Sequence, residues 1–239
     1  YATRLGAGLP ILIHSIIYDA ANPMTVWAST YNNLYLDARR QLKAAGIPAA
    51  QLEAREIVCY AAGKDREQFF RDLPLYASDT VEQQVKELTR RRLEGEPVAY
   101  IIGEWEFYGL TLDVSPEVLI PRMDTEVLAE QAILAARSVE ENCRVLDLCT
   151  GSGCVGLAVA ANVPQCRVVL ADLSEGALRI CRQNIRRCGL TAQVISVTAD
   201  AMLPPLPNLW DFDVIACNPP YIPTADILTL DESVKNYEP

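Results

Sequence analysis

The chain has 239 residues, half of them apolar, which is enough for one medium domain and a small companion around buried cores. Its 21 basic and 31 acidic residues leave a net charge of −10, which disfavours a nucleic-acid backbone as the main partner. No stretch approaches the roughly 20 uninterrupted apolar residues of a membrane span, so we expect a chain without a membrane partner.

The first 23 residues differ from those that follow. The chain begins at Tyr1, whereas Met24 opens an amphipathic pattern that suits a normal protein start. The apolar run at 9–17 has only Arg4 as a nearby basic residue, which is poor for a secretory signal. We therefore expect residues 1–23 to be extraneous to the fold.

Residues 24–96 are predicted to form a helical domain. Apolar residues recur every three or four positions between 31 and 45, between 52 and 61, and between 81 and 88. Gly46 and Gly63 supply stops for the first two helices. The third helix is expected to begin near Asp79, with Glu82 three residues later.

The remaining residues predict a linker and an α/β domain. Residues 97–120 are rich in strand formers, with Gly109 placed for a turn, and indicate a hairpin linking two domains. Within 121–239, a helix near 127–135 leads into alternating strands and helices, which predict a Rossmann-like α/β fold with a parallel sheet. The expected strands are 144–148, 167–171, 193–197 and 212–217, and the expected helices between them are 153–161 and 174–188. Ligands of such sheets bind beyond the carboxyl ends of the strands.

The first motif with chemical content follows the strand at 144–148, where residues 147–153 read Asp-Leu-Cys-Thr-Gly-Ser-Gly. Gly151 and Gly153 lack a Cβ, so they can adopt positive φ and let a ligand lie against the backbone, facing the amides of the next helix. These residues are expected to line a cofactor site: Asp147, Cys149, Thr150, Gly151, Ser152 and Gly153.

The same loop suits two classes of cofactor. Gly151, Gly153 and Gly156 satisfy G-x-G-x-x-G, and an acid ends the second strand, as in sites for nicotinamide cofactors or for S-adenosyl-L-methionine. Asp147 favours S-adenosyl-L-methionine, because a carboxylate beside the loop repels a pyrophosphate but attracts a sulfonium and an ammonium. Further contacts to the ribose and the adenine are expected after the second and third strands, from Asp172, Asp200 and Ala201.

The second motif is Asn218-Pro219-Pro220-Tyr221, which follows the fourth strand. Two prolines fix the backbone, so the Asn218 side chain and the Pro219 carbonyl can be preorganised acceptors for both N–H groups of a planar nitrogen. Tyr221 offers an aromatic face for a flat substrate group. We interpret Asn218, Pro219 and Tyr221 as catalytic and the whole motif as the substrate site, with Asn218 also facing the cofactor.

The eight cysteines contain no Cys-x-x-Cys pair, and the single histidine is His14, so no metal site is expected. Thiols without a pairing pattern are typical of a reducing compartment, where disulfides seldom persist. We predict reduced, mostly buried cysteines and a cytoplasmic protein.

Several stretches together resemble one known family. They are Glu94–Gly103, Glu106–Leu110 and Leu119–Glu126, in addition to the glycine loop and the Asn-Pro-Pro-Tyr motif. Across residues 24–239 the chain resembles the release-factor glutamine methyltransferases, the HemK/PrmC family. The resemblance implies that S-adenosyl-L-methionine donates a methyl group to the glutamine amide in the Gly-Gly-Gln loop of peptide-chain release factors. It also implies that the helical N-terminal domain helps to bind this protein substrate.

Carried over by position, the resemblance assigns residues 149–153 to the methionine part of the cofactor, Asp172 to its ribose, and residues 218–221 to the glutamine. The chain departs from the family's usual proline, glycine and aromatic residue at Met123, Cys149 and Ala201. The family's sheet has seven strands, and this chain ends soon after the fourth. We therefore expect a class I methyltransferase sheet that is truncated at its C-terminal side.

The leading hypothesis is a monomer that methylates release factors and has no direct nucleic-acid partner. Three alternatives stay open: methylation of a ribosomal-protein glutamine, methylation of a base amino group, and an inactive cofactor-binding fragment. A nicotinamide oxidoreductase also remains formally compatible with the glycine spacing.

Overall fold

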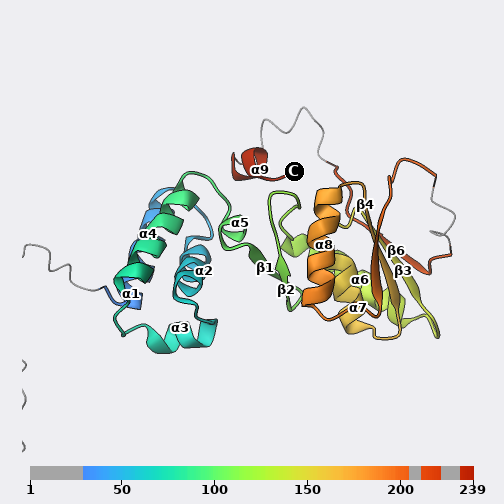
Figure 1. The fold of residues 1–239 in the computed structure, drawn as a ribbon, viewed down its shortest axis with the longest axis horizontal. Coiled ribbons are helices and arrows are strands. Elements are labelled where there is room, and N and C mark those ends of the chain that lie inside the picture. The colour runs from blue at the N-terminus through green and yellow to red at the C-terminus, as the bar shows by residue number, and fades with distance from the viewer. Residues whose placement is uncertain (1–28, 205–210, 222–231) are drawn as a thin grey trace, which may run out of the picture.

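The structure is a computed structural model, and it describes residues 29–204, 211–221 and 232–239. Figure 1 shows a helical part beside an α/β part, with a short helix and a hairpin between them. The expectations for residues 1–23, including His14, lie outside the described residues, as does the proposed start at Met24. None of the helices in the described ranges is long and apolar enough to cross a membrane.

Four helices make up the helical part. They are α1 (Tyr31–Ala44), α2 (Ala50–Ala62), α3 (Arg66–Asp72) and α4 (Asp79–Leu93). Side chains of Thr30, Asp65 and Ser78 accept backbone N–H groups at the starts of α1, α3 and α4, and Gly63 ends α2 with a φ of 60°. The three expected helices are confirmed, and the seven-residue α3 is an additional one. Their apolar faces meet in one core around Leu42, Ile57 and Phe69.

The connection between the two parts combines a helical turn with a hairpin. The helix α5 (Val98–Ile102) precedes the strands β1 (Glu104–Phe107) and β2 (Leu110–Asp113), which pair antiparallel. The hairpin is confirmed, but assigning residues 98–102 to it was wrong. This short apolar run has no periodicity that separates strand from helix. Its helical form is favoured because it buries Val98, Ala99, Tyr100 and Ile101, and the Tyr100 hydroxyl donates to the Val118 carbonyl at 2.6 Å.

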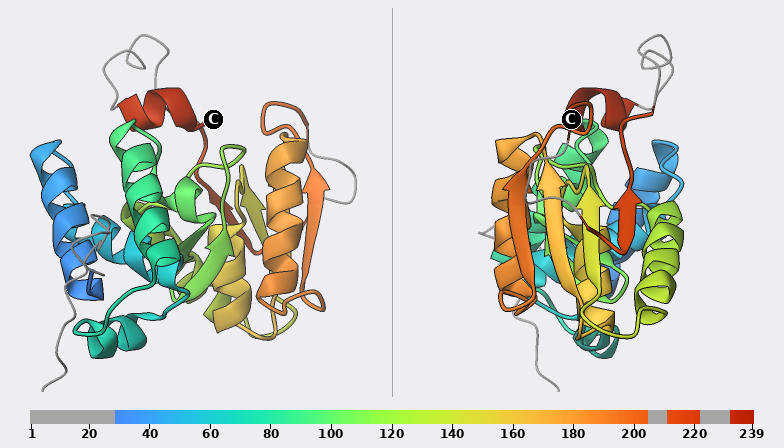
Figure 2. Two further views of the ribbon diagram at one scale, coloured as in Figure 1. Left: turned by 60° about the vertical axis from the view of Figure 1, so that its left-hand side comes forward. Right: turned by 90° about the vertical axis from the view of Figure 1, so that its right-hand side faces the viewer.

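The α/β part has a four-stranded parallel sheet in the described ranges, with strand order β5-β4-β3-β6. The predicted strands and the helices between them are confirmed to within two residues at every boundary, and the helix expected near 127–135 is confirmed but begins four residues earlier. Figure 2 shows the strands side by side, with the helices of the α/β part on one face of the sheet. The elements are α6 (Met123–Arg137), β3 (Arg144–Leu148), α7 (Cys154–Asn162), β4 (Arg167–Asp172), α8 (Glu175–Arg187), β5 (Val194–Thr198) and β6 (Val214–Cys217).

The alternation of side chains along each strand decides which of them meet the helices. Val145 pairs with Val168 and Val214, and its side chain is buried in the core under α6 and α7. Side chains alternate along a strand, so Asp147, two residues later, points to the same helix-covered face. Leu146 and Val169 lie on the other face, in a smaller apolar cluster with Ala171.

The last described helix, α9 (Glu232–Tyr237), lies between the two parts in Figure 1. The Tyr237 hydroxyl donates to the Glu94 carbonyl at 3.4 Å, and Glu238 forms an ion pair with Arg122. Glu94 and Arg122 belong to two of the stretches that carry the family resemblance. The segment 232–239 therefore joins the end of α4 to the start of the α/β part.

Gly156 allows α7 to pack closely on the sheet. A Cβ at this position would lie 2.2 Å from the Leu170 side chain and 3.1 Å from the Asp147 Cβ. Gly156→Ala should therefore lower the free energy of unfolding by about 1–3 kcal/mol, measured by urea denaturation. Gly176→Ala is the matched control, because its Cβ would meet only the flexible carboxylate of Glu117, and its stability should change little or rise. Equal stability of the two variants would contradict the packing role of Gly156.

Candidate functional site

The glycine loop turns sharply at the carboxyl end of β3. Gly151 and Gly153 have φ angles of +55° and +87°, which confirms the expected positive φ. The Gly151 amide donates to Asp172 Oδ2 and the Ser174 amide donates to Asp172 Oδ1, each at 2.9 Å. The Asp172 carboxylate, at the end of β4, thus fixes the loop and the start of α8. It remains partly exposed, so its oxygens have lone pairs left for hydroxyl donors.

Asp147 lies beneath the loop, where only 2% of its surface is exposed. Its Oδ2 accepts the Thr150 hydroxyl at 2.6 Å and the Gly156 amide at 2.9 Å. Asp147 was expected to line the cofactor site, and the alternation along β3 turns its side chain toward α7, so that it meets the loop from beneath. The carboxyl instead supports the loop through these two hydrogen bonds. The loop lies between its charge and the site.

Burial raises the pKa of the Asp147 carboxyl to about 6, although the hydrogen bonds from Thr150 and Gly156 oppose the rise. The folded protein therefore binds this proton more tightly than the unfolded chain does. Between about pH 4 and pH 6 the free energy of unfolding should fall as the pH rises.

Asp147→Asn should remove this dependence, because one amide oxygen can replace Oδ2 for both donors. We expect the variant to gain on the order of 2–3 kcal/mol over the parent chain between pH 4 and pH 7, measured by denaturant unfolding without cofactor. Parallel stability profiles for the two proteins would contradict an ionising Asp147.

The other predicted cofactor residues differ in what they can offer. Thr150 and Ser152 have buried side chains, so the backbone of the loop is what they can present to a ligand. Cys149 is half-buried and adopts a φ of +58°, which is unusual for a residue with a side chain. Asp200 is half-buried and its Oδ1 accepts the Met202 amide at 2.9 Å, while Ala201 is exposed.

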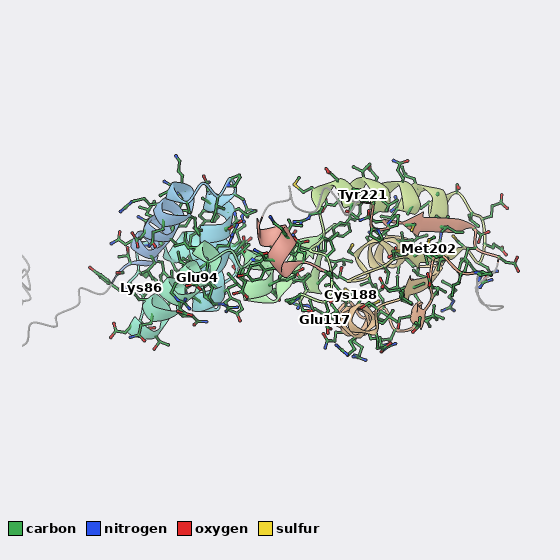
Figure 3. The ribbon with its side chains drawn as sticks, turned by 90° about the horizontal axis from the view of Figure 1, so that it is seen from above. Lys86, Glu94, Glu117, Cys188, Met202 and Tyr221 are labelled. Carbon is green, nitrogen blue, oxygen red and sulfur yellow. The ribbon has the colours of Figure 1, made fainter. Side chains whose placement is uncertain are left out.

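The Asn-Pro-Pro-Tyr motif leaves the sheet beside the glycine loop. Leu148 at the end of β3 pairs with Cys217 at the end of β6, so Cys149 and Asn218 follow adjacent strand ends. Asn218 is half-buried, and its side chain makes no hydrogen bond in the part of the chain that the structure describes. Tyr221 is 78% exposed and is labelled in Figure 3, which views the molecule from above. The fold thus brings the glycine loop and the Asn-Pro-Pro-Tyr motif together. The second motif offers free acceptors and an exposed aromatic ring.

Comparisons with known proteins assign this arrangement to a family. A family profile described as "PrmC N-terminal domain" matches residues 33–103, and one described as "Methyltransferase small domain" matches residues 111–230. A "Release factor glutamine methyltransferase" of Nitratidesulfovibrio vulgaris is 36% identical over 222 residues, which are 91% of this chain and 73% of that protein. The chain belongs to the release factor glutamine methyltransferase family.

Other comparisons show how far the similarity extends. The protein of the same description from Thermodesulfovibrio yellowstonii is 38% identical over 188 residues, or 78% of this chain and 66% of its own length. The chain thus spans about two thirds to three quarters of these two relatives. Among solved structures, the N-terminal domain of human METTL16 in complex with SAH is 20% identical over 49% of each chain, with a TM-score of 0.38.

The cofactor of a release factor glutamine methyltransferase is S-adenosyl-L-methionine, and the described residues fit it. Gly151 has no atom within 4 Å of the position a Cβ would take, so the backbone is open to a ligand there. Asp172 supplies a partly exposed carboxylate at the adjacent strand end, suited to ribose hydroxyls. The partly exposed carboxylate of Asp172 suits the cationic end of such a cofactor better than a pyrophosphate.

Asn184 is a site-supporting residue that the sequence reasoning missed. It is completely buried in α8, and its Nδ2 donates to the Ser152 carbonyl at 2.9 Å and to the Asp113 carbonyl at 3.0 Å. Its Oδ1 accepts the Asp113 amide at 2.6 Å. One side chain therefore ties the glycine loop to the hairpin. A polar residue on the apolar face of α8, between Cys181 and Ile185, was the available signal.

Asn184→Ala should remove the partner of three backbone groups: the buried Ser152 carbonyl and the partly buried amide and carbonyl of Asp113. We expect a loss of roughly 2–4 kcal/mol in the free energy of unfolding, measured by urea denaturation, and weaker binding of S-adenosyl-L-methionine. A loss well below 1 kcal/mol with unchanged cofactor affinity would show that Asn184 does not position the loop.

Proposed function

We propose that this chain transfers the methyl group of S-adenosyl-L-methionine to the side-chain nitrogen of the glutamine in the Gly-Gly-Gln motif of peptide-chain release factors. The observation that carries the proposal is the adjacency of β3 and β6, whose ends place the glycine loop beside Asn218. The names of the relatives support release factors as the substrate. Family membership supports the type of reaction.

Asn218 and Pro219 are the residues to which we assign the glutamine. The Asn218 side-chain oxygen and the Pro219 carbonyl would accept the two N–H groups of the amide and hold it in one plane. Accepting both hydrogens also raises the electron density on the nitrogen. Tyr221, with its ring exposed, would cover the flat face of the amide.

The cofactor loop would act by holding its ligand in place. Residues 149–153 would contact the methionine part through the backbone, Asp172 the ribose, and Asp200 and Ala201 the adenine. When bound, S-adenosyl-L-methionine supplies a methyl group on a positively charged sulfur. Positioning of two reactants in this way can contribute roughly 7–11 kcal/mol toward the barrier, so the site needs no strong base.

The setting of the reaction is part of the same proposal. We place the activity in the cytoplasm, because all eight cysteines are free thiols. We assign substrate recognition to the helical domain at 24–96, the linker to 97–120 and catalysis to residues from 121 onward. Because every assigned residue comes from one chain, a monomer suffices.

Mass spectrometry of substrate proteins tests the proposal. A purified release factor incubated with the protein and S-adenosyl-L-methionine should gain one methyl group, located on the glutamine of Gly-Gly-Gln. A release factor with that glutamine replaced by alanine is the control and should gain none. Methylation of ribosomal proteins or of nucleic-acid bases in parallel reactions, with none on the release factor, would contradict it.

A further inference from the structure

Two cysteines lie close together at the candidate site, where the strands β3 and β6 end. Cys149 opens the glycine loop after β3, and Cys217 ends β6 immediately before Asn218. Because Cys217 is the strand partner of Leu148, the residue before Cys149, the two cysteines occupy neighbouring positions across the sheet edge. The two thiols lie close enough to shift each other's pKa, and both side chains are half-buried. A dithiol therefore connects the two motifs to which we assign cofactor and substrate.

The remaining cysteines provide a contrast within the same chain. Cys143 and Cys166 form a second such pair, beside the opposite ends of β3 and β4, but they are only 0% and 1% exposed. Cys59, Cys154 and Cys181 are buried, and Cys188 is half-buried at the end of α8. Among the eight cysteines, all of which are described, Cys149 and Cys217 form the one pair of neighbouring thiols that is partly exposed.

We propose that Cys149 and Cys217 form a redox couple that a peroxide converts to a disulfide, and that this disulfide lowers cofactor binding. The spacing suits the bond, because Cys149 directly follows Leu148, the residue opposite Cys217. Neighbouring strands lie about 4.8 Å apart, and an offset of one residue, roughly 3.3 Å, keeps the pair within the roughly 4.4–6.8 Å between Cα atoms that a disulfide joins. The second half of the proposal rests on the proposed function, because it assumes that the glycine loop binds S-adenosyl-L-methionine.

The order of the two steps follows from the effect of each thiol on the other. Burial raises the pKa of both thiols, to about 11 for Cys217, but the Cys217 thiol opposes the rise at Cys149, whereas the Cys149 thiol adds to the rise at Cys217. Cys149 is therefore the cysteine that loses its proton more easily and forms the thiolate. Its sulfur attacks the peroxide, the O–O bond breaks, and one oxygen leaves as water after protonation, giving a sulfenic acid. The Cys217 sulfur then displaces the second oxygen as water. In total the peroxide is reduced to two waters, and two thiols become one disulfide.

The disulfide would alter the loop because Cys149 is its first residue. Cys149 adopts a φ of +58°, and Gly151 and Gly153, close behind it, also adopt positive φ. A covalent bond to Cys217 fixes the Cys149 side chain against β6 and constrains this turn. The same bond holds the residue before Asn218, so both halves of the site respond to one oxidation.

Peptide mapping tests the bond itself, without any substrate. The full chain is treated with hydrogen peroxide, alkylated under denaturing conditions, digested and analysed by mass spectrometry. We expect the peptides holding Cys149 and Cys217 to be joined with the loss of two hydrogens, and to separate again with dithiothreitol. Cys143 and Cys166 serve as the internal control and should still be alkylated as thiols. Bond formation at Cys143 and Cys166 first, or oxidation of Cys149 without a link to Cys217, would overturn the proposal.

Two variants test whether the disulfide joins Cys149 to Cys217. Cys217→Ala should give no joined peptide and should accumulate a sulfenic acid on Cys149 that dimedone traps. In Cys149→Gly, glycine, the residue that adopts positive φ most easily, replaces a residue whose φ is +58°. This variant should therefore fold, and it should also give no joined peptide. A joined peptide involving the remaining partner in either variant would overturn the pairing.

Calorimetry with S-adenosyl-L-methionine tests the effect on binding. We expect the oxidised protein to bind roughly tenfold more weakly than the reduced protein, or worse, and dithiothreitol to restore the affinity. Equal affinities would overturn the regulatory half of the proposal. If the reduced protein bound no cofactor, the proposed function would fail, whereas the peptide map would still decide whether the dithiol exists.

Discussion

Replacing Asn218 with alanine is expected to reduce the turnover number for methyl transfer by roughly two to four orders of magnitude. The Asn218 side chain is half-buried and makes no hydrogen bond within the described residues, so its truncation removes no hydrogen bond from that part of the fold. In the proposed site its oxygen accepts an N–H of the glutamine amide, and losing one such preorganised group removes both orientation and electrostatic stabilisation. The loss should therefore appear in turnover, measured as methyl groups added to a release factor per unit time.

The comparison variant for this experiment is Asn162→Ala. Asn162 ends α7, remote from the carboxyl ends of the strands, and its side chain donates only to the Ala158 carbonyl within the same helix. Its turnover should match that of the parent chain. Thermal unfolding of both variants shows whether the fold is intact. A folded Asn218→Ala protein with more than about a tenth of the parent's turnover would contradict a catalytic role for Asn218.

Replacing Asp172 with alanine is expected to raise the dissociation constant for S-adenosyl-L-methionine by about a hundredfold or more. The variant loses the acceptors for the Gly151 and Ser174 amides as well as the carboxylate assigned to the ribose. Unsatisfied donors and a missing charged hydrogen bond together cost roughly 2–3 kcal/mol of binding. Asp172→Asn should show a smaller increase, since it keeps one acceptor oxygen. Calorimetric titration measures both constants.

Asp213→Ala is the matched control for Asp172. The Asp213 carboxylate also accepts a backbone amide, that of Arg144 at 2.8 Å, but it lies at the amino end of the sheet. Both alanine variants should therefore be less stable to urea than the parent chain, and only the Asp172 variant should bind cofactor weakly. Equal losses of cofactor affinity would mean that Asp172 acts through stability alone.

Much of the α/β part could be predicted from the sequence because strand and helix periods differ clearly. The apolar runs at 144–148 and 167–172 are bounded by turn residues, and the glycines of the loop require positive φ in any sequence of this pattern. The sequence predicted that β3 and β6 end at the same edge of the sheet, but it did not predict that they are neighbouring strands. Family resemblance, not periodicity, supplied the substrate.

Other features depend on contacts between distant residues. The burial of the Asp147 side chain depends on which face of the sheet α6 and α7 cover, and this follows from tertiary packing, which no local pattern reveals. Asn184 matters because α8 packs on both Ser152 and Asp113, residues 32 and 71 positions away. The α5 helix is five residues long, and a run of that length becomes helical through its burial, not through its own propensity.

The central claim is that Asn218 faces the nitrogen that receives the methyl group. A crystal structure of the protein with S-adenosylhomocysteine and a Gly-Gly-Gln peptide measures this directly. We expect the Asn218 side-chain oxygen within about 3 Å of the glutamine amide nitrogen, and that nitrogen on the side of the cofactor sulfur. An Asn218 side chain turned into solvent or into the core, with the glutamine bound elsewhere, would contradict the claim.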